Sequence, residues 1–231
     1  MPERYAIYFA PPVTSELWRK SAIWLGRDAL TGGEIAADIA DVDPERRRHL
    51  TRSARRYGFH ATLKAPMALA ASLSDRDLDR ALGAWAASRG PVEIGRLTIV
   101  SLDGFLALVP TEQSAALTAF AAAVVEDFDG FRSALTEAER TRRQGALTPR
   151  QAVLLEQFGY PYVAEEFKFH MTLTDGIEDL AERARFAGAV TDFFAFMADE
   201  PIVLDRLTLF REAAPGAPFM RLRDYMLTGE A

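Results

Sequence analysis

The phrase Phe-His-x-Thr-Leu occurs twice in this chain, once around His60 and once around His170. The two histidines are 110 residues apart, and the same spacing relates the triplet Arg-Leu-Thr at 96–98 to its copy at 206–208. No insertion or deletion is needed between these matches. A repeat that keeps its register over this distance indicates a duplicated supersecondary unit.

Each half of the chain predicts the same order of elements, namely strand, helix, strand, helix and hairpin. The repeat units span residues of about 5–102 and 105–226, with turn signals at Asp103-Gly104 and Pro215-Gly216. The predicted helices are 15–25, 44–56, a helix capped by Ser74, the stripe within 117–128, and 179–197. The predicted strands include 5–9, 57–64 and 167–174, and residues 132–150 are a polar insertion that contains several arginines.

These elements predict an α+β fold. We expect a single bilobal domain over residues 1–231, in which each lobe is an antiparallel sheet with helices packed outside. The two lobes of such a duplicated fold are related by a pseudo-two-fold axis, with a central cleft between them.

Side chains in a strand point alternately to opposite faces, so each copy of the repeated phrase has an apolar face and a polar face. The polar residues of the two copies are His60, Thr62 and Lys64, and Lys168, His170 and Thr172. If the halves are related by a pseudo-two-fold axis, the two polar faces meet across the cleft. We therefore expect two imidazoles and two hydroxyls, flanked by lysines, around one small space.

Two imidazoles and two hydroxyls suit the hydrolysis of a phosphodiester. Near neutral pH one histidine can be the free base while the other carries a proton. The base deprotonates an attacking water, and the acid protonates the departing alkoxide. Threonine hydroxyls and lysines can hold the non-bridging oxygens, on which charge builds in the transition state. This chemistry requires no cofactor.

Other catalytic sites fit the sequence less well. Two histidines with no cysteine, no adjacent carboxylate pair and no His-Glu-x-x-His spacing are a poor set of metal ligands, so we expect no metal. A serine triad uses one histidine, and the chain has no Gly-x-Ser-x-Gly turn. A histidine in a strand can also have a purely structural role, but a repeated His-x-Thr on the polar face argues against this.

The bulk composition indicates an ordinary globular protein. The chain has 231 residues, 49% of them apolar, and no run of apolar residues long enough to span a membrane. The absence of cysteine and of a signal-peptide pattern favours the cytoplasm. The net charge of −6 argues against general coating of nucleic acids. We expect a monomer.

At the repeated phrases the sequence resembles the 2H phosphoesterases, which include bacterial RNA 2′,5′ ligase-like proteins and cyclic phosphodiesterases. The resemblance spans nearly the whole chain and implies that His60, Thr62, His170 and Thr172 line a central cleft. It also implies that one lobe comes from the middle of the chain and the other from both ends. The wider phrases RYGFHATLKAP and FGYPYVAEEFKFHMTLT resemble the branch encoded in phosphonate-utilisation operons.

Further residues near the two phrases are candidates for substrate binding. Six arginines lie within 46–56, immediately before the first phrase, and they form either a funnel for an anionic substrate or a solvated helix face. Arg56 and Tyr57 are the nearest of this segment to the expected cleft. Tyr160 and Tyr162, in the loop before the second phrase, either stack against a nucleobase or sugar or pack against the protein.

We therefore predict a metal-independent phosphodiesterase of the two-histidine type. Its expected substrate is a small cyclic or 2′-linked phosphodiester or a phosphorylated ribose, with an RNA end as another possibility. The main rival is a non-catalytic protein that binds RNA or a nucleotide in the same cleft. A purely structural partner protein comes third, because it would not need the polar face to be repeated.

Overall fold

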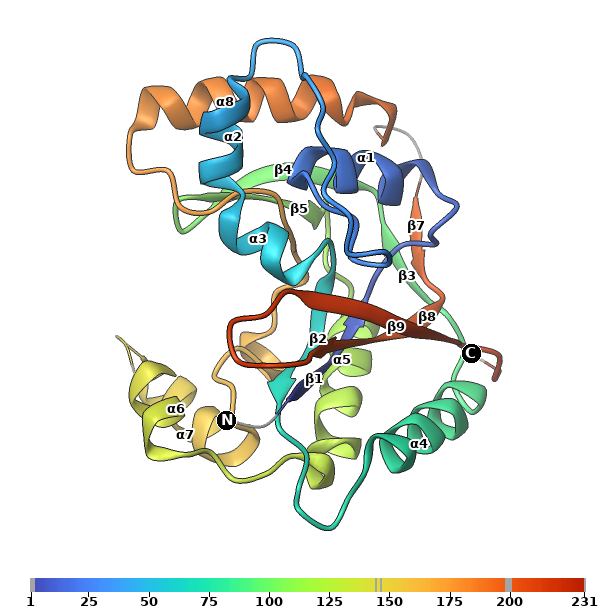
Figure 1. The fold of residues 1–231 in the computed structure, drawn as a ribbon. Helices are drawn as coiled ribbons and strands as arrows, with labels where there is room; N and C mark the ends of the chain where they lie inside the picture. The colour runs from blue at the N-terminus through green and yellow to red at the C-terminus, as the bar shows by residue number, and fades with distance from the viewer. Residues whose placement is uncertain (1–2, 144, 146, 198–200, 231) are drawn as a thin grey trace.

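A seven-stranded antiparallel sheet runs through the molecule in the order β4-β5-β6-β2-β1-β8-β9, and β3 pairs with β7 in a separate two-stranded ribbon (Figure 1). The computed structural model describes residues 3–143, 145, 147–197 and 201–230. The strands are β1 Arg4–Phe9, β2 Ala61–Met67, β3 Val92–Gly95, β4 Leu97–Leu102, β5 Phe105–Pro110, β6 Met171–Thr172, β7 Ile202–Leu204, β8 Arg206–Glu212 and β9 Phe219–Met226.

Helices cover the sheet at two ends of the molecule. In Figure 1, α1, α2 and α8 gather at one end, and α4 to α7 lie at the other. α8 packs against β4, α5 against β2, and α4 against β8 and β9. The helices are α1 Glu16–Leu25, α2 Pro44–Leu50, α3 Arg52–Tyr57, α4 Asp75–Ala87, α5 Ala115–Asp127, α6 Glu137–Arg143, α7 Pro149–Phe158 and α8 Leu180–Phe193.

Local sequence signals account for most helix boundaries. The hydroxyl of Ser15 accepts a hydrogen bond from the Trp18 backbone N–H and begins α1, and Ser74 begins α4 through a capping box with Asp77. The expected basic helix at 44–56 is split at Thr51 into α2 and α3. The polar insertion at 132–150, for which no helix was predicted, contains α6 and the start of α7.

The Phe-His-x-Thr-Leu strands are held by apolar packing on one side. Phe59, Ala61, Phe169 and Met171 are all almost fully buried, as the alternation predicts. Trp24 of α1 is also fully buried, and its indole N–H donates to the Leu173 carbonyl over 2.9 Å. The second phrase is therefore fixed both by its apolar face and by a hydrogen bond from α1.

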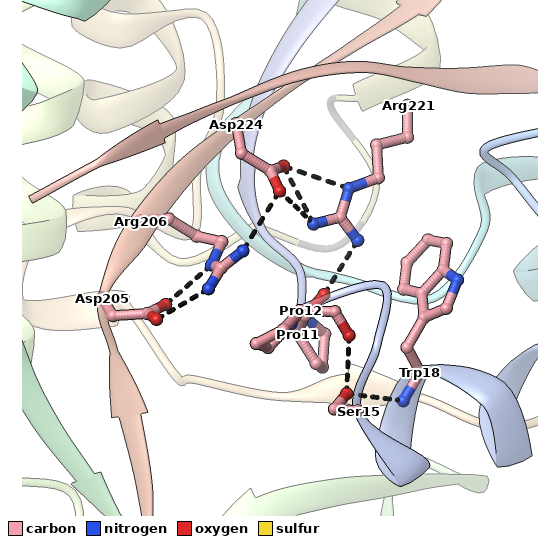
Figure 2. A network of polar contacts seen from close by, with 8 residues as sticks. All are labelled: Pro11, Pro12, Ser15, Trp18, Asp205, Arg206, Arg221 and Asp224. Carbon is pink, nitrogen blue, oxygen red and sulfur yellow. Dashed lines mark hydrogen bonds and ion pairs between the residues drawn. The ribbon is translucent and has the colours of Figure 1, made fainter.

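A buried arginine fastens the C-terminal hairpin to the turn after β1 (Figure 2). Arg221 of β9 donates to both carboxylate oxygens of Asp224 and, over 2.8 Å, to the Pro11 carbonyl. Its guanidinium also lies 4.5 Å from the ring centre of Trp18. Because the Arg221 side chain is only 2% exposed, this anchor is well shielded from solvent and fixes β9 relative to β1 and α1.

The strands that we expected in two separate lobe sheets belong to one continuous sheet. Strands β2 and β6, which carry the two phrases, are neighbours joined at the residue pair Ala61 and Met171. The α+β class with antiparallel pairing is confirmed. The second phrase forms a shorter strand than expected, because only Met171–Thr172 of the predicted 167–174 is extended and paired.

Candidate active site

The register between β2 and β6 brings the two repeated phrases together. Ala61 pairs with Met171 in antiparallel orientation. In this register His60 lies opposite Thr172, and Thr62 lies opposite His170. Since Ala61 and Met171 point into the core, the four polar side chains share the other face of the sheet. The two histidines are then diagonal neighbours, at the spacing of about 7–8 Å typical of such positions.

This face of the sheet forms the floor of a cavity of about 610 Å³. A volume of this size is typical of small-molecule sites. His60, Thr62 and Thr172 line the cavity, whereas His170 lies beside it and is not part of the wall. The remaining lining residues are Arg4, Tyr8, Ser53, Ala54, Arg56, Tyr57, Gly58, Ala65, Pro66, Arg143, Tyr160, Pro215 and Gly216.

The imidazole of His60 is held in one orientation by three contacts. Its ring stacks on Tyr8 with 3.7 Å between ring centres and 19° between planes. Nδ1 is 2.8 Å from the Gly58 carbonyl oxygen, so Nδ1 carries the proton and donates it. Nε2 is then the acceptor and lies 3.2 Å from the Thr62 hydroxyl. The tautomer therefore presents a basic nitrogen on the side of Thr62.

Burial lowers the pKa of His60 from 6.5 to about 4. The hydrogen bond to Gly58 acts in the opposite direction, and the nearby charge of His170 lowers the pKa further. No lysine is among the causes of this shift. His60 is consequently neutral at physiological pH, and desolvation by the Tyr8 ring and the cavity wall is the main reason.

His170 makes the same backbone contact in different surroundings. Its Nδ1 donates to the Lys168 carbonyl over 2.8 Å, so its Nε2 is also the acceptor when the ring is neutral. Phe105 is the aromatic neighbour, 5.8 Å away and tilted by 55°. Tyr8 pairs with Thr62 across β1 and β2, and Ala107 pairs with Thr172 across β5 and β6. The position that holds Tyr8 in the first half therefore holds a methyl group in the second.

We expected Lys64 to lie beside His60 on the polar face of the strand, and this expectation is wrong. Ile7 pairs with Lys64 but Tyr8 pairs with Thr62, so β2 has a bulge with one extra residue at Leu63. The bulge breaks the alternation and places Lys64 among the buried side chains, 3% exposed. Its ammonium donates to the Val125 carbonyl over 2.9 Å and to Asp129 over 3.1 Å. Lys64 therefore ties β2 to α5 and cannot reach a substrate in the cavity.

The other predicted binding residues divide into two groups. Arg56, Tyr57 and Tyr160 line the cavity. Burial raises the pKa of Tyr160 to about 12, so its hydroxyl remains a hydrogen-bond donor. Lys168 is exposed and Tyr162 is 48% exposed, and neither is part of the cavity wall.

Most of the basic segment at 46–56 has a structural role. Arg46 forms a bidentate pair with Glu182 over 2.7 Å, and buried Arg47 donates to the carbonyls of Ile23 and Ala37. Arg56 is the only one of the six arginines among the cavity-lining residues, so the expected funnel does not form from the whole segment.

Tyr8, Arg4 and Arg143 are among the cavity residues that the sequence reasoning missed. Tyr8 is fully buried, and its hydroxyl has no hydrogen-bond partner among the described residues. Alternation within 5–9 could have shown that Tyr8 lies on the face opposite Ile7 and Phe9. No local signal singles out Arg4 at the start of β1 or Arg143 at the end of α6.

Within residues 3–143, 145, 147–197 and 201–230, no three His, Cys, Asp or Glu side chains gather as ligands for a metal ion. No helix in the part of the chain that the structure describes has the length and apolar character needed to cross a membrane.

Two curated proteins are similar to this chain over most of its length. One, "Ribose 1,5-bisphosphate phosphokinase PhnN" of Janthinobacterium sp. (strain Marseille), is 35% identical over 232 residues, which is 98% of this chain. The other, of the same name from Laribacter hongkongensis (strain HLHK9), is 33% identical over 224 residues and 95% of this chain. Each match covers 51% of the relative, so the chain spans about half the length of these proteins.

A solved structure described as "Crystal structure of phosphoesterase" aligns over 99% of both chains, with a TM-score of 0.44 and 13% identity. A family model matches residues 62–220, a segment that contains Thr62 and the whole second phrase. Because this match covers well over half of the chain, the chain belongs to the family described as "Protein of unknown function (DUF1045)".

Proposed function

We propose that this protein is a metal-independent phosphodiesterase of the 2H type, acting on a small cyclic or 2′-linked phosphodiester by two-histidine acid–base catalysis. The observation that carries the proposal is the register of Ala61 with Met171, which sets each imidazole opposite the threonine of the other phrase. His60, Thr62 and Thr172 then lie on the floor of a cavity large enough for a small ligand, and His170 is beside it.

The scissile phosphate is proposed to lie over the pair of strands, between the two threonines. Thr62 and Thr172 donate hydrogen bonds to its non-bridging oxygens. The Thr62 hydroxyl, now beside the Nε2 atom of His60, turns to the phosphate when substrate binds. Such donors stabilise the phosphorane-like transition state more than the ground state, because negative charge on these oxygens increases as water attacks.

The two histidines are proposed to have different roles, which follow from their surroundings. His60 is neutral and presents Nε2 as an acceptor, so it takes a proton from the attacking water. The water oxygen forms a bond to phosphorus while the bond to the leaving oxygen breaks. His170, protonated at Nε2, gives this proton to the leaving oxygen. The products are a phosphomonoester and a free hydroxyl, and proton exchange with solvent restores both imidazoles.

A ribose-containing substrate is supported by the names of the curated relatives. Both are described as kinases of ribose 1,5-bisphosphate, and the chain matches about half of each. None of the three lysines of this chain follows a glycine, so it contains no Gly-x-x-x-x-Gly-Lys-Ser/Thr loop of the type common in kinases. Opening a cyclic phosphate on ribose 5-phosphate yields a ribose bisphosphate, so the proposed reaction produces the class of compound named in the relatives. The phosphonate-operon branch is part of the same proposal.

The order of the strands supports a duplicated, two-lobed origin for this site. From the β6–β2 boundary outward, the sheet reads β6-β5-β4 on one side and β2-β1-β8 on the other. Each side has a phrase strand, then the first strand of its repeat unit, then a strand with the triplet Arg-Leu-Thr at or beside its start. We propose that a pseudo-two-fold axis passes between Ala61 and Met171 and relates the two half-sites.

A binding protein without catalysis is the second candidate, because Tyr57 and Tyr160 add aromatic surface to the cavity wall. Such a protein would hold a nucleotide or an RNA end and release it unchanged. Retention of an intact cyclic nucleotide with no product, at any pH, would support this candidate.

The decisive experiment is a turnover screen of nucleoside 2′,3′-cyclic phosphates, 2′,5′-linked dinucleotides and ribose cyclic phosphates, with and without EDTA. We expect a phosphomonoester product from at least one class, formed at the same rate in EDTA. Activity that disappears in EDTA and returns with zinc or manganese would refute the metal-independent mechanism.

A further inference from the structure

A pair of arginines shares one buried carboxylate at the cavity wall. The Nε atom of Arg4 donates to Glu212 over 2.5 Å, and Arg56 donates to the other carboxylate oxygen. The backbone N–H of Gly216 adds a third hydrogen bond to Glu212, over 3.0 Å. Burial alone would raise the pKa of Glu212, but these donors hold it below its ordinary value. The cluster therefore stays ionised and has a net charge of +1.

Tyr57 of the cavity wall and the buried Phe219 fix the directions of both guanidiniums. Tyr57 stacks on Phe219 with 4.9 Å between ring centres. The guanidinium of Arg56 lies 5.0 Å from the ring centre of Tyr57, and that of Arg4 lies 5.7 Å from the ring centre of Phe219. Arg56 also donates to the carbonyl of Gly216 over 3.2 Å. These contacts restrict the rotamers of both arginines, so little conformational entropy is lost when they bind a ligand.

Arg143 adds a third guanidinium from a different part of the chain. It donates to the Gly159 carbonyl and, over 3.3 Å, to the Pro66 carbonyl. Arg143 and Tyr160 both line the cavity, and the charge of Arg143 acts on the Tyr160 hydroxyl. The wall of the cavity thus holds three arginines, and none of the described residues that line it is an aspartate or a glutamate.

The histidines and threonines already account for one phosphate group. A diester phosphate has a single negative charge, and it is proposed to bind on the sheet floor, where His60, Thr62 and Thr172 lie. Around the same cavity, the Arg4–Arg56–Glu212 cluster keeps a net charge of +1, and with Arg143 it supplies more guanidinium groups than this one phosphate needs. Guanidinium groups with fixed directions are suited to phosphate oxygens, because they donate two hydrogen bonds in parallel. A cavity of about 610 Å³ also has room for a sugar in addition to the reacting phosphate.

We infer that Arg4, Arg56 and Arg143 form a second anion subsite, which binds a non-reacting phosphomonoester of the substrate. The inference rests on the proposed function and specifies its substrate class: a ribose that has a cyclic or 2′-linked diester on one side and a monoester phosphate on the other. Tyr57 and Tyr160 flank the sugar or its phosphate from the wall. The subsite selects for the dianionic group and sets the distance between the two phosphates.

The test compares two substrates that differ only in the second phosphate, cytidine 2′,3′-cyclic phosphate with and without a 5′-phosphate. We expect kcat/KM to be about 10–100-fold higher for the 5′-phosphorylated compound, the range expected for charge-assisted hydrogen bonds. In the variants Arg56→Gln and Arg143→Gln this preference, taken as the ratio of the two kcat/KM values, should fall about tenfold. Arg48→Gln, an exposed arginine paired with Glu34, is the control and should keep the wild-type preference.

Equal kcat/KM for the two wild-type reactions would overturn the second subsite and leave the diesterase intact. If neither compound is hydrolysed, the subsite is tested by calorimetry with ribose 5-phosphate and ribose. If ribose 5-phosphate binds and its binding weakens in Arg56→Gln, the subsite is supported although the proposed catalysis fails. If ribose 5-phosphate does not bind, both the subsite and the proposed catalysis are overturned. Circular dichroism confirms that each variant is folded.

Discussion

The two halves of the site start from the same five-residue phrase and differ in what surrounds it. In the first half His60 is stacked on Tyr8 and hydrogen-bonded to the Thr62 hydroxyl, and its pKa is lowered to about 4. In the second half Ala107 takes the place of Tyr8, and the aromatic neighbour of His170 is the tilted ring of Phe105. A duplicated motif can therefore provide a base and an acid, because the neighbouring strands give each imidazole a different environment.

The largest expected effect is loss of either imidazole. His60→Gln and His170→Gln should each lower kcat by about 10²–10⁴-fold, because each removes one proton-transfer step. The double variant should be little worse than the worse single one, since the two groups act together. His49→Gln, the third histidine, is exposed on α2 and serves as the control. A loss confined to one of the two site variants would contradict the paired mechanism.

Tyr8 tests the difference between the halves directly. Tyr8→Ala, which copies Ala107, should raise the pKa of His60 towards 6.5, measured by NMR titration of the imidazole. It should also cost about 3–5 kcal/mol in the free energy of unfolding, as for other large aromatic truncations in a core. Tyr8→Phe keeps the stacked ring and removes a hydroxyl without a partner, so stability should change by less than about 1 kcal/mol and the pKa should stay low. A high His60 pKa in Tyr8→Phe would show that the stack is not the cause.

The same pKa predicts a dependence of stability on pH. Because the folded-state value of about 4 lies below the unfolded value of 6.5, the unfolded chain binds more protons between these pH values. His60 therefore stabilises the fold above pH 6.5, and about 3 kcal/mol of this stability is lost as the pH falls from 6.5 through 4. Urea unfolding of wild type and of His60→Gln across pH 4–7 isolates the contribution of His60 to stability. The other titrating groups with shifted pKa values, such as Glu212 and Asp129, contribute equally in the two proteins. Parallel pH profiles would contradict the buried environment of His60.

The lysines of the two phrases should differ in stability rather than in activity. Lys64→Met breaks the contacts to Val125 and Asp129 and should cost about 1–3 kcal/mol in thermal or urea unfolding, with nearly normal kcat/KM of the folded enzyme. Lys168→Met, at an exposed position, should change stability by less than about 0.5 kcal/mol. A large loss of activity in folded Lys64→Met would mean that Lys64 reaches the substrate.

Local sequence rules were sufficient for the elements and for the core side of the motif. Alternation placed Phe59 and Ala61 inside, and the cap at Ser74 and the Asp103-Gly104 turn lie where the sequence predicts. These signals are local, because each depends on side chains within a few residues of the backbone group that they satisfy.

Tertiary structure alone decided which polar residues form the site. The pairing of Ala61 with Met171 and the bulge at Leu63 depend on strands that are distant in sequence, and the bulge moves Lys64 to partners on α5. Arg4 and Arg143 likewise reach the cavity from segments without any motif. The alternation of side chains along a strand predicts which of them share a face only where no bulge interrupts the strand. The sequence by itself thus determined the repeated phrases and their buried side, whereas contacts between distant segments determined the cavity that they face.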